Sequence, residues 1–88
     1  MTWTVHVHVE AAKQLNAIPP DRRRRILDDV SAFEEDPLSV LVKPLKGKHH
    51  KGKYRKVSGR YRIIFKPIHA TRTVEVLAIL LRNERTYQ

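Results

Sequence analysis

The feature that most constrains this chain is a long segment that contains no carboxylate. Asp36 is the last acid before the segment and Glu75 is the first acid after it. The basic residues between these two positions are Lys43, Lys46, Lys48, Lys51, Lys53, Arg55, Lys56, Arg60, Arg62, Lys66 and Arg72. A folded domain tolerates so many like charges when they face water or a polyanion. Because parts of this segment are also typical of core strands, we expect the sheet to present a cationic face.

The composition predicts a single cytoplasmic domain over residues 1–88. The chain carries a formal net charge of +9, which suggests a nucleic-acid partner. A basic protein that is merely soluble, or one neutralised by an acidic protein, would have the same charge. The chain has no cysteine, so neither a disulfide framework nor thiolate chemistry is expected. No apolar run approaches the roughly 20 residues that cross a bilayer and no signal peptide is evident, so no membrane partner is predicted.

Residues 2–9 alternate between apolar and polar side chains, which predicts a half-buried strand. One face carries Trp3, Val5, Val7 and Val9. The other face carries Thr4, His6 and His8. The two histidines could hold a metal ion in principle, but no further ligand stands at a recognisable spacing. We therefore expect solvated histidines, no metal site and no cofactor.

Two helices should follow, one over residues 10–18 and one from Pro20 to about Glu35. Pro19-Pro20 separates them, because a residue that precedes proline is driven out of the helical region. The buried stripe of the second helix is expected to be Ile26, Leu27, Val30 and Phe33. The arginines at 22–25 cannot share one helix face, so most should be solvated, with binding of RNA or an acidic partner as the alternative.

The sequence predicts an irregular connection over residues 38–53, punctuated by Pro44, Gly47 and Gly52. Its lysine-rich end should be a mobile cationic loop, which lacks the spacing of a phosphate-binding P-loop. His49-His50 within it is a poor site for a divalent cation.

Three strands are expected at residues 54–57, 61–68 and 73–81, and their short connections make them antiparallel neighbours. The last of them is continuously apolar and should be central in the sheet or covered on both faces. The predicted fold class is therefore α+β, with an N-terminal strand, a helical hairpin and a three-stranded antiparallel meander. The helices should pack on one face of a small, mostly antiparallel sheet.

Three short motifs occur in a fixed order along this pattern. Lys43-Pro44-Leu45-Lys46-Gly47 precedes Tyr54-Arg55, then Gly59-Arg60-Tyr61-Arg62-Ile63-Ile64-Phe65 follows, and Leu81-Arg82 comes before Tyr87. In these motifs the chain resembles the RelE/ParE superfamily of bacterial toxins from type II toxin–antitoxin modules. The usual pattern of that superfamily is a KPLKG segment, a YR…GxYRvIY hairpin and a C-terminal R…Y. The resemblance covers nearly the whole chain and implies the RelE-like fold.

The resemblance also implies an activity and partners. RelE-like members are metal-independent, ribosome-dependent endoribonucleases that cleave mRNA and so inhibit translation, and this branch is favoured. ParE-like members share the fold but poison DNA gyrase. A small, acidic cognate antitoxin is expected to form a hetero-oligomer with the chain, besides the ribosome and mRNA as partners. A catalytically inactive RNA-binding member is the third hypothesis.

By resemblance, Arg62 and Arg82 belong to the nuclease site, and Tyr87 can stack on a base. Arg55 fits the first position of a basic pair in the family, but the second position falls at Val57. Lys56, adjacent to it, would point to the opposite face of a regular strand unless a bulge re-aims it.

Metal-independent RNA cleavage needs deprotonation of the 2′-OH, neutralisation of the phosphorane charge and stabilisation of the leaving 5′-oxygen. The planar guanidinium groups of Arg62 and Arg82 suit the second task. Arginine stays protonated, so the base must be another group. The open candidates are Lys56, Lys53, Glu84, His49 and His50. The residues expected to contact the backbone of mRNA or rRNA are Lys43, Lys46, Lys48, Lys51, Lys53 and Arg60.

Each arginine has a structural alternative. Arg62 could form an ion pair with Glu75, and Arg82 could cap the exit of the last strand. Either arrangement would remove the guanidinium group from a phosphate site.

Overall fold

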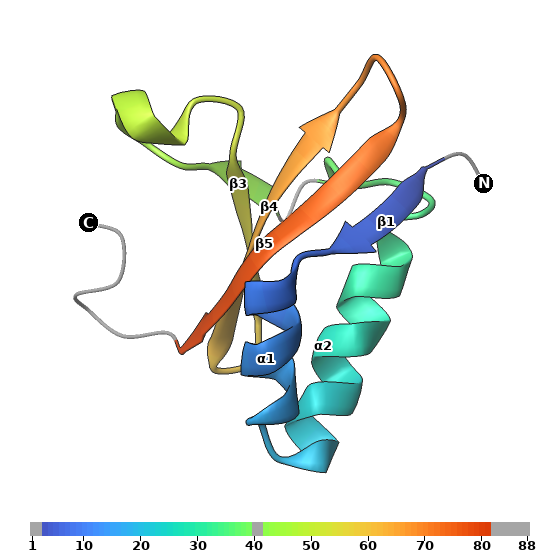
Figure 1. Ribbon diagram of the computed structural model, residues 1–88, viewed down its shortest axis with the longest axis vertical. Helices are drawn as coiled ribbons and strands as arrows, with labels where there is room; N and C mark the ends of the chain where they lie inside the picture. Colours follow the sequence, from blue (N-terminus) through green and yellow to red (C-terminus); the bar gives the residue numbers. More distant parts are fainter. Residues whose placement is uncertain (1–2, 40–41, 82–88) are drawn as a thin grey trace.

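The computed structural model describes residues 3–39 and 42–81, and in them two helices pack on one face of a single five-stranded sheet (Figure 1). The elements are β1 (Thr4–Val7), α1 (Val9–Asn16), α2 (Pro20–Ala32), β2 (Val42–Pro44), the short 3-10 helix η1 (Lys48–His50), β3 (Tyr54–Ser58), β4 (Tyr61–Ile68) and β5 (Thr73–Leu81). This arrangement confirms the predicted α+β class. No helix in the described part of the chain is long and apolar enough to span a bilayer.

The strand order across the sheet is β1-β5-β4-β3-β2. The pairs β2–β3, β3–β4 and β4–β5 are antiparallel, whereas β1 runs parallel to β5. The interior position of β5, between β1 and β4, agrees with its continuous apolar sequence, because a strand with a neighbour on each side and a covered face has little polar surface to present.

A bulge in β5 explains why its apolar run does not alternate. Ile64 pairs with Ala78 and Phe65 pairs with Val76, so Leu77 is an extra residue on the β5 side. The extra residue places Val76 and Ile79, three positions apart, on the same face of the sheet. Both are buried under the helices together with Phe65.

The hydrophobic core lies between the helices and the sheet. Its largest members include Phe33 of α2 and Phe65 of β4, whose ring centroids are 4.3 Å apart. Two side chains predicted to be buried are exposed instead, Leu27 at 43 % and Val9 at 72 %. Adjacent residues on a helix point in different directions, so with Ile26 facing the core, Leu27 lies outside the buried stripe. Val9 begins α1, and the strand alternation therefore stops before it.

The strand β2 is the element that the sequence analysis missed. Residues 38–53 were expected to be irregular, but Val42–Pro44 pairs with Lys56, Arg55 and Tyr54 of β3. The strand has three residues and ends on a proline, which an edge strand tolerates because one side of its backbone needs no partner. The other expected strands agree with the structure to within two residues at each end.

Candidate functional site

The face of the sheet opposite the helices, here called the open face, carries Arg55 and Arg62, two of the arginines that the sequence analysis selected. Val57 pairs with Arg62 and Arg55 pairs with Ile64 in the β3–β4 hairpin. Paired residues project to the same side, and residues two apart on one strand share a face. Arg55 and Arg62 therefore lie on one face, as diagonal neighbours whose Cβ atoms are about 7–8 Å apart.

Lys43 extends this cationic group to the edge of the sheet. It is the register partner of Arg55 across the β2–β3 pair, and its side chain is exposed. Three adjacent strands thus each contribute one cation, Lys43, Arg55 and Arg62, to the same patch. Guanidinium groups at this spacing can contact neighbouring oxygens of a phosphodiester chain.

A groove of about 660 Å³ opens next to this patch. Its lining residues are Lys43, Pro44, Leu45, Lys46, Gly47, Lys48, His49, His50 and Arg55. None of the described residues that line it is a carboxylate. Pro44, Leu45 and Gly47 were not among the predicted site residues, although the KPLKG segment that contains them was the signal that could have identified them. The charged side chains in the described wall of the groove are therefore all cationic, which suits an anionic chain.

The turn in the loop that forms this groove depends on Gly47. Its φ is +105°, a value that residues with a Cβ rarely adopt. The 3-10 helix η1 begins at the next residue and carries Lys48, His49 and His50 into the groove wall. Lys51 and Lys53 follow η1 and are not among the lining residues.

Lys56 lies on the other face of the sheet. The β3–β4 register is uninterrupted from Tyr54 to Ser58, so no bulge re-aims this side chain. Its Nζ is 3.7 Å from Asp29 Oδ1 of α2 and 5.8 Å from the centre of the Phe33 ring. The structure therefore places Lys56 under the helices, away from Arg55 and Arg62.

Arg60 belongs to a different surface from the groove. It lines a pocket of about 180 Å³ at the β3–β4 turn, with Arg22, Arg25, Ser58, Gly59 and Tyr61. The arginines at 22, 24 and 25 are exposed, as expected, while the half-buried Arg23 donates from Nη2 to the Ile18 carbonyl oxygen at 3.0 Å.

Glu75 is not next to Arg62. It is the register partner of Lys66, four residues along β4, and Arg62 lies opposite Leu80 instead. The ion pair that Glu75 forms is with His8. The β4–β5 register therefore does not support the alternative in which Arg62 forms an ion pair with Glu75. Arg82, Glu84 and Tyr87 lie outside the described residues.

Val57 occupies the place opposite Arg62 where the resemblance would put a second basic residue. Its side chain is 42 % exposed and carries no proton-accepting group. The cationic patch therefore has a neutral gap at its centre.

Solved structures of other proteins share this fold over nearly the whole chain. A chain of the archaeal RelE–RelB complex from Pyrococcus horikoshii OT3 superposes with a TM-score of 0.82 at 27 % identity, covering 96 % of this chain and 99 % of that one. The toxin–antitoxin complex RelBE2 from Mycobacterium tuberculosis also gives 0.82, at 23 % identity and coverages of 93 % and 100 %. A YoeB/ParE toxin from Agrobacterium tumefaciens gives 0.75 at 14 % identity, with coverages of 91 % and 99 %.

Comparison of sequences adds no further relative. No protein-family model matches the chain, and no curated protein matches it either. The assignment to a superfamily rests on the structural matches, which cover nearly the whole chain, and on the motifs described above. The chain is a member of the RelE/ParE superfamily of toxins.

Proposed function

We propose that this protein is the toxin of a type II toxin–antitoxin pair and acts as a metal-independent, ribosome-dependent endoribonuclease on mRNA. One observation supports this proposal above the others. Arg55 and Arg62 share the open face, next to a groove that no described carboxylate lines. A site that holds a scissile phosphodiester needs such a concentration of positive charge.

The arrangement suggests a division of labour. Arg62 and Arg55 would neutralise the charge of the phosphorane, with Arg82 as a further guanidinium and Tyr87 as a base-stacking group. Lys43, Lys46 and Lys48 would hold the nucleic-acid backbone along the groove without selecting a sequence. The expected products are a 2′,3′-cyclic phosphate or 3′-phosphate and a 5′-OH.

Among the described candidates for the general base, those on the groove side of the sheet fit the proposal better than Lys56. Lys56 lies on the helix-covered face, where it could not reach a phosphate held by Arg55 and Arg62. His49 and His50 line the groove itself. Imidazole can accept a proton near neutral pH, so these two residues are our leading candidates among the described ones.

An acidic antitoxin is the proposed protein partner. Matched structures are complexes of RelE with RelB-type antitoxins. The open face of this chain would attract a segment with negative charges, and such a segment would cover the groove and exclude RNA. The site of action would be the cytoplasm, where mRNA and ribosomes meet.

Expression of the chain in bacterial cells, with mapping of mRNA 5′ ends by primer extension, tests the proposal. We expect new in-frame cuts with the wild type and about 100-fold fewer with Arg62→Ala, Arg55→Ala or Arg82→Ala, the loss typical of one removed charge-stabilising donor. Lys56→Met and Lys13→Gln are matched controls that each remove one cation from the helix side, and both should cut like the wild type.

Two other outcomes would overturn the nuclease assignment. Growth arrest with intact mRNA and broken chromosomal DNA would identify a gyrase poison instead. Absence of toxicity, together with RNA binding that weakens steeply with salt, would identify an inactive RNA-binding member.

A further inference from the structure

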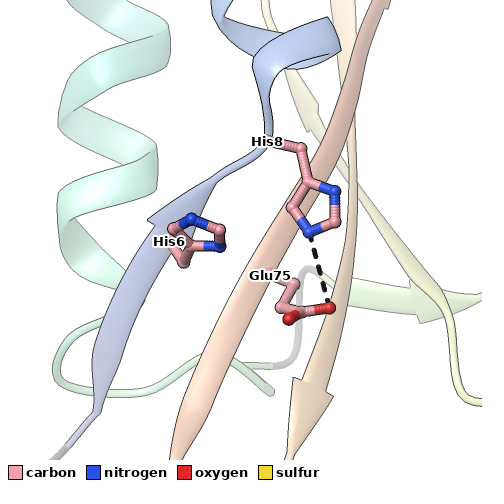
Figure 2. A group of neighbouring side chains, drawn as sticks. All are labelled: His6, His8 and Glu75. Atoms are coloured by element: carbon pink, nitrogen blue, oxygen red, sulfur yellow. Dashed lines mark ion pairs between the residues drawn. The ribbon is translucent and has the colours of Figure 1, made fainter.

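A cluster of three metal-ligating side chains lies at the β1 edge of the open face. His6 lies on β1, His8 follows the end of that strand, and Glu75 lies on β5 (Figure 2). The ligating atoms of the three side chains all lie within 4.8 Å of one another. No other such group occurs in the part of the chain that the structure describes.

The parallel pairing of β1 with β5 creates this cluster. His6 is the register partner of Glu75, and His8 projects from the same side of the chain as His6 because it stands two residues further on. The His8 backbone is fixed on both sides: its N–H donates to the Val76 carbonyl at 3.0 Å, and its carbonyl accepts from Ala12 N at 2.9 Å. The positions of the ligands are therefore set by the sheet and by the start of α1.

The distances suit a tetrahedral ion. With metal–ligand bonds of about 2.0–2.2 Å, two ligands of a tetrahedral zinc ion are about 3.3–3.6 Å apart. His8 Nε2 and Glu75 Oε1 are already 3.5 Å apart, and the ring centroids of His6 and His8 are separated by 5.3 Å. The remaining pairs of ligating atoms are no more than 4.8 Å apart, and the exposed His6 side chain has room to turn toward the other two ligands.

Two further observations point to a cation at this place. His8 Nε2 is shielded from solvent and has no hydrogen-bond partner among the described residues, although its ion pair with Glu75 shows that it faces the carboxylate. Lys66 is the β4 partner of Glu75, but its side chain extends the other way. Its Cε lies 3.6 Å from the position that a Cβ on Gly52 would take, on the β3 side of β4. The ammonium group therefore does not occupy the cluster.

We propose that His6, His8 and Glu75 form a binding site for a divalent transition metal ion, with Zn²⁺ as the best fit. Two imidazole nitrogens and one carboxylate oxygen are a known ligand set for zinc, whereas Mg²⁺ and Ca²⁺ prefer oxygen ligands alone. Three protein ligands leave a coordination position for water. The bound ion would link the edge strand β1 to its neighbour β5.

This site is separate from the proposed nuclease site. Glu75 lies opposite Lys66, which is about 13 Å along β4 from Arg62 at the rise of a regular strand. Metal binding here neither requires nor supplies the RNA-cleaving chemistry, so the two proposals can fail independently.

Calorimetric titration of ZnCl₂ into the full chain tests the site, using protein without a histidine tag that has been dialysed against a chelator. We expect one Zn²⁺ per chain with a dissociation constant on the order of 1 μM, weaker than four-ligand structural sites because one ligand is missing. His6→Ala, His8→Ala and Glu75→Gln should each weaken binding at least tenfold, the smallest loss expected even for an outer partner of a ligand. MgCl₂ should give no heat of specific binding.

A double variant, His49→Ala with His50→Ala, is the matched control because it removes two histidines from the groove and leaves the cluster of His6, His8 and Glu75 intact. It should bind Zn²⁺ like the wild type. Thermal unfolding gives a second measurement: the midpoint should rise with added Zn²⁺ in the wild type and in this control, and rise less in His8→Ala at the same Zn²⁺ concentration. The proposal is wrong if wild-type protein binds no zinc, or if the affinity disappears in the His49/His50 variant while His8→Ala retains it.

Discussion

Val57 is the residue at which this chain departs most clearly from the pattern it resembles. It pairs with Arg62 and projects from the open face, so in the proposed nuclease site it would lie close to a phosphate held by Arg55 and Arg62. Valine neutralises nothing and accepts no proton. The proposed nuclease would therefore depend on another group for proton transfer, with His49, His50, Lys53 and Glu84 as the candidates.

Replacing Val57 with lysine should supply a base beside Arg62. We expect Val57→Lys to raise the rate of mRNA cleavage about 10- to 100-fold, at the lower end of the gain from a positioned acid–base group. Cleavage of a reporter mRNA on purified ribosomes measures the effect. Val57→Met has a similar length without a charge and should leave the rate unchanged. An equal increase in both variants would mean that bulk, rather than proton transfer, is responsible.

At the level of the elements, the junction of α1 with β5 supports the sheet where β1 ends. The last paired residue of β1 is Val7, opposite Val76. Further along β5, the Ile79 N–H donates to Gln14 Oε1 of α1 at 2.6 Å. A helix side chain thus satisfies a backbone donor that the short edge strand does not reach.

Loss of this acceptor should destabilise the fold without touching the open face. We expect Gln14→Leu to lower the free energy of unfolding by about 1–2 kcal/mol, because a partly buried N–H then has no partner. Urea denaturation followed by circular dichroism measures the change. Gln14→Glu keeps an oxygen at the same position and should cost less. Equal losses in the two variants would contradict the role assigned to the oxygen.

Over the whole molecule, the acids are concentrated in residues 10–36, where they outnumber the cations, whereas the strands β2 to β4 carry cations and no acid. Seven of the nine acids lie between Glu10 and Asp36, in the helical hairpin and the turn that follows it. The basic segment forms β2, β3, β4 and the groove. The electrostatic potential should therefore be more positive on the open face than on the helix side, and a polyanion should approach the open face first.

The salt dependence of RNA binding should report this direction. For single strands, the slope of log Kobs against log salt concentration changes by about 0.7 for each phosphate contact. The double variant Lys43→Gln/Arg55→Gln should reduce the magnitude of the slope by about 1.4, measured by fluorescence anisotropy with a labelled single-stranded RNA. Lys13→Gln/Arg24→Gln removes the same charge from the helices and should leave the slope unchanged. Equal slopes for both double variants would show that charge alone, not its placement, controls binding.

The parts of the fold that could be predicted from the sequence are those that local patterns specify. The limits of β4 and β5 follow from long apolar runs with turns at both ends, and the α1–α2 break follows from two prolines. The strand β2 could not be predicted because three residues ending in proline give no periodicity. Leu27 could not be excluded from the core because the tilt of α2 on the sheet decides which edge of its stripe is covered.

For the candidate site, the alternation of side chains along each strand predicts only which face of the sheet a residue lies on. Alternation and hairpin pairing place Arg55 and Arg62 on one face and Lys56 on the other, given a regular strand. The third member of the His6–His8 cluster could not be predicted, because Glu75 comes beside them through a parallel pairing between distant parts of the chain. Sequence spacing carries no information about such a contact.

The pairing of β5 with β1 also determines when the sheet can be completed during synthesis of the chain. β1 is synthesised first, yet its one neighbour in the sheet is β5, with Val5 opposite Val74. Non-local pairing of this kind forms late in folding, after the intervening chain is available. A ribosome that stalls before residue 73 would release a fragment without Val74, Val76 and Ile79, the β5 share of the core. Such fragments would have no support for the strands that carry Arg55 and Arg62, so an aborted translation product of this toxin should be harmless to the cell that made it.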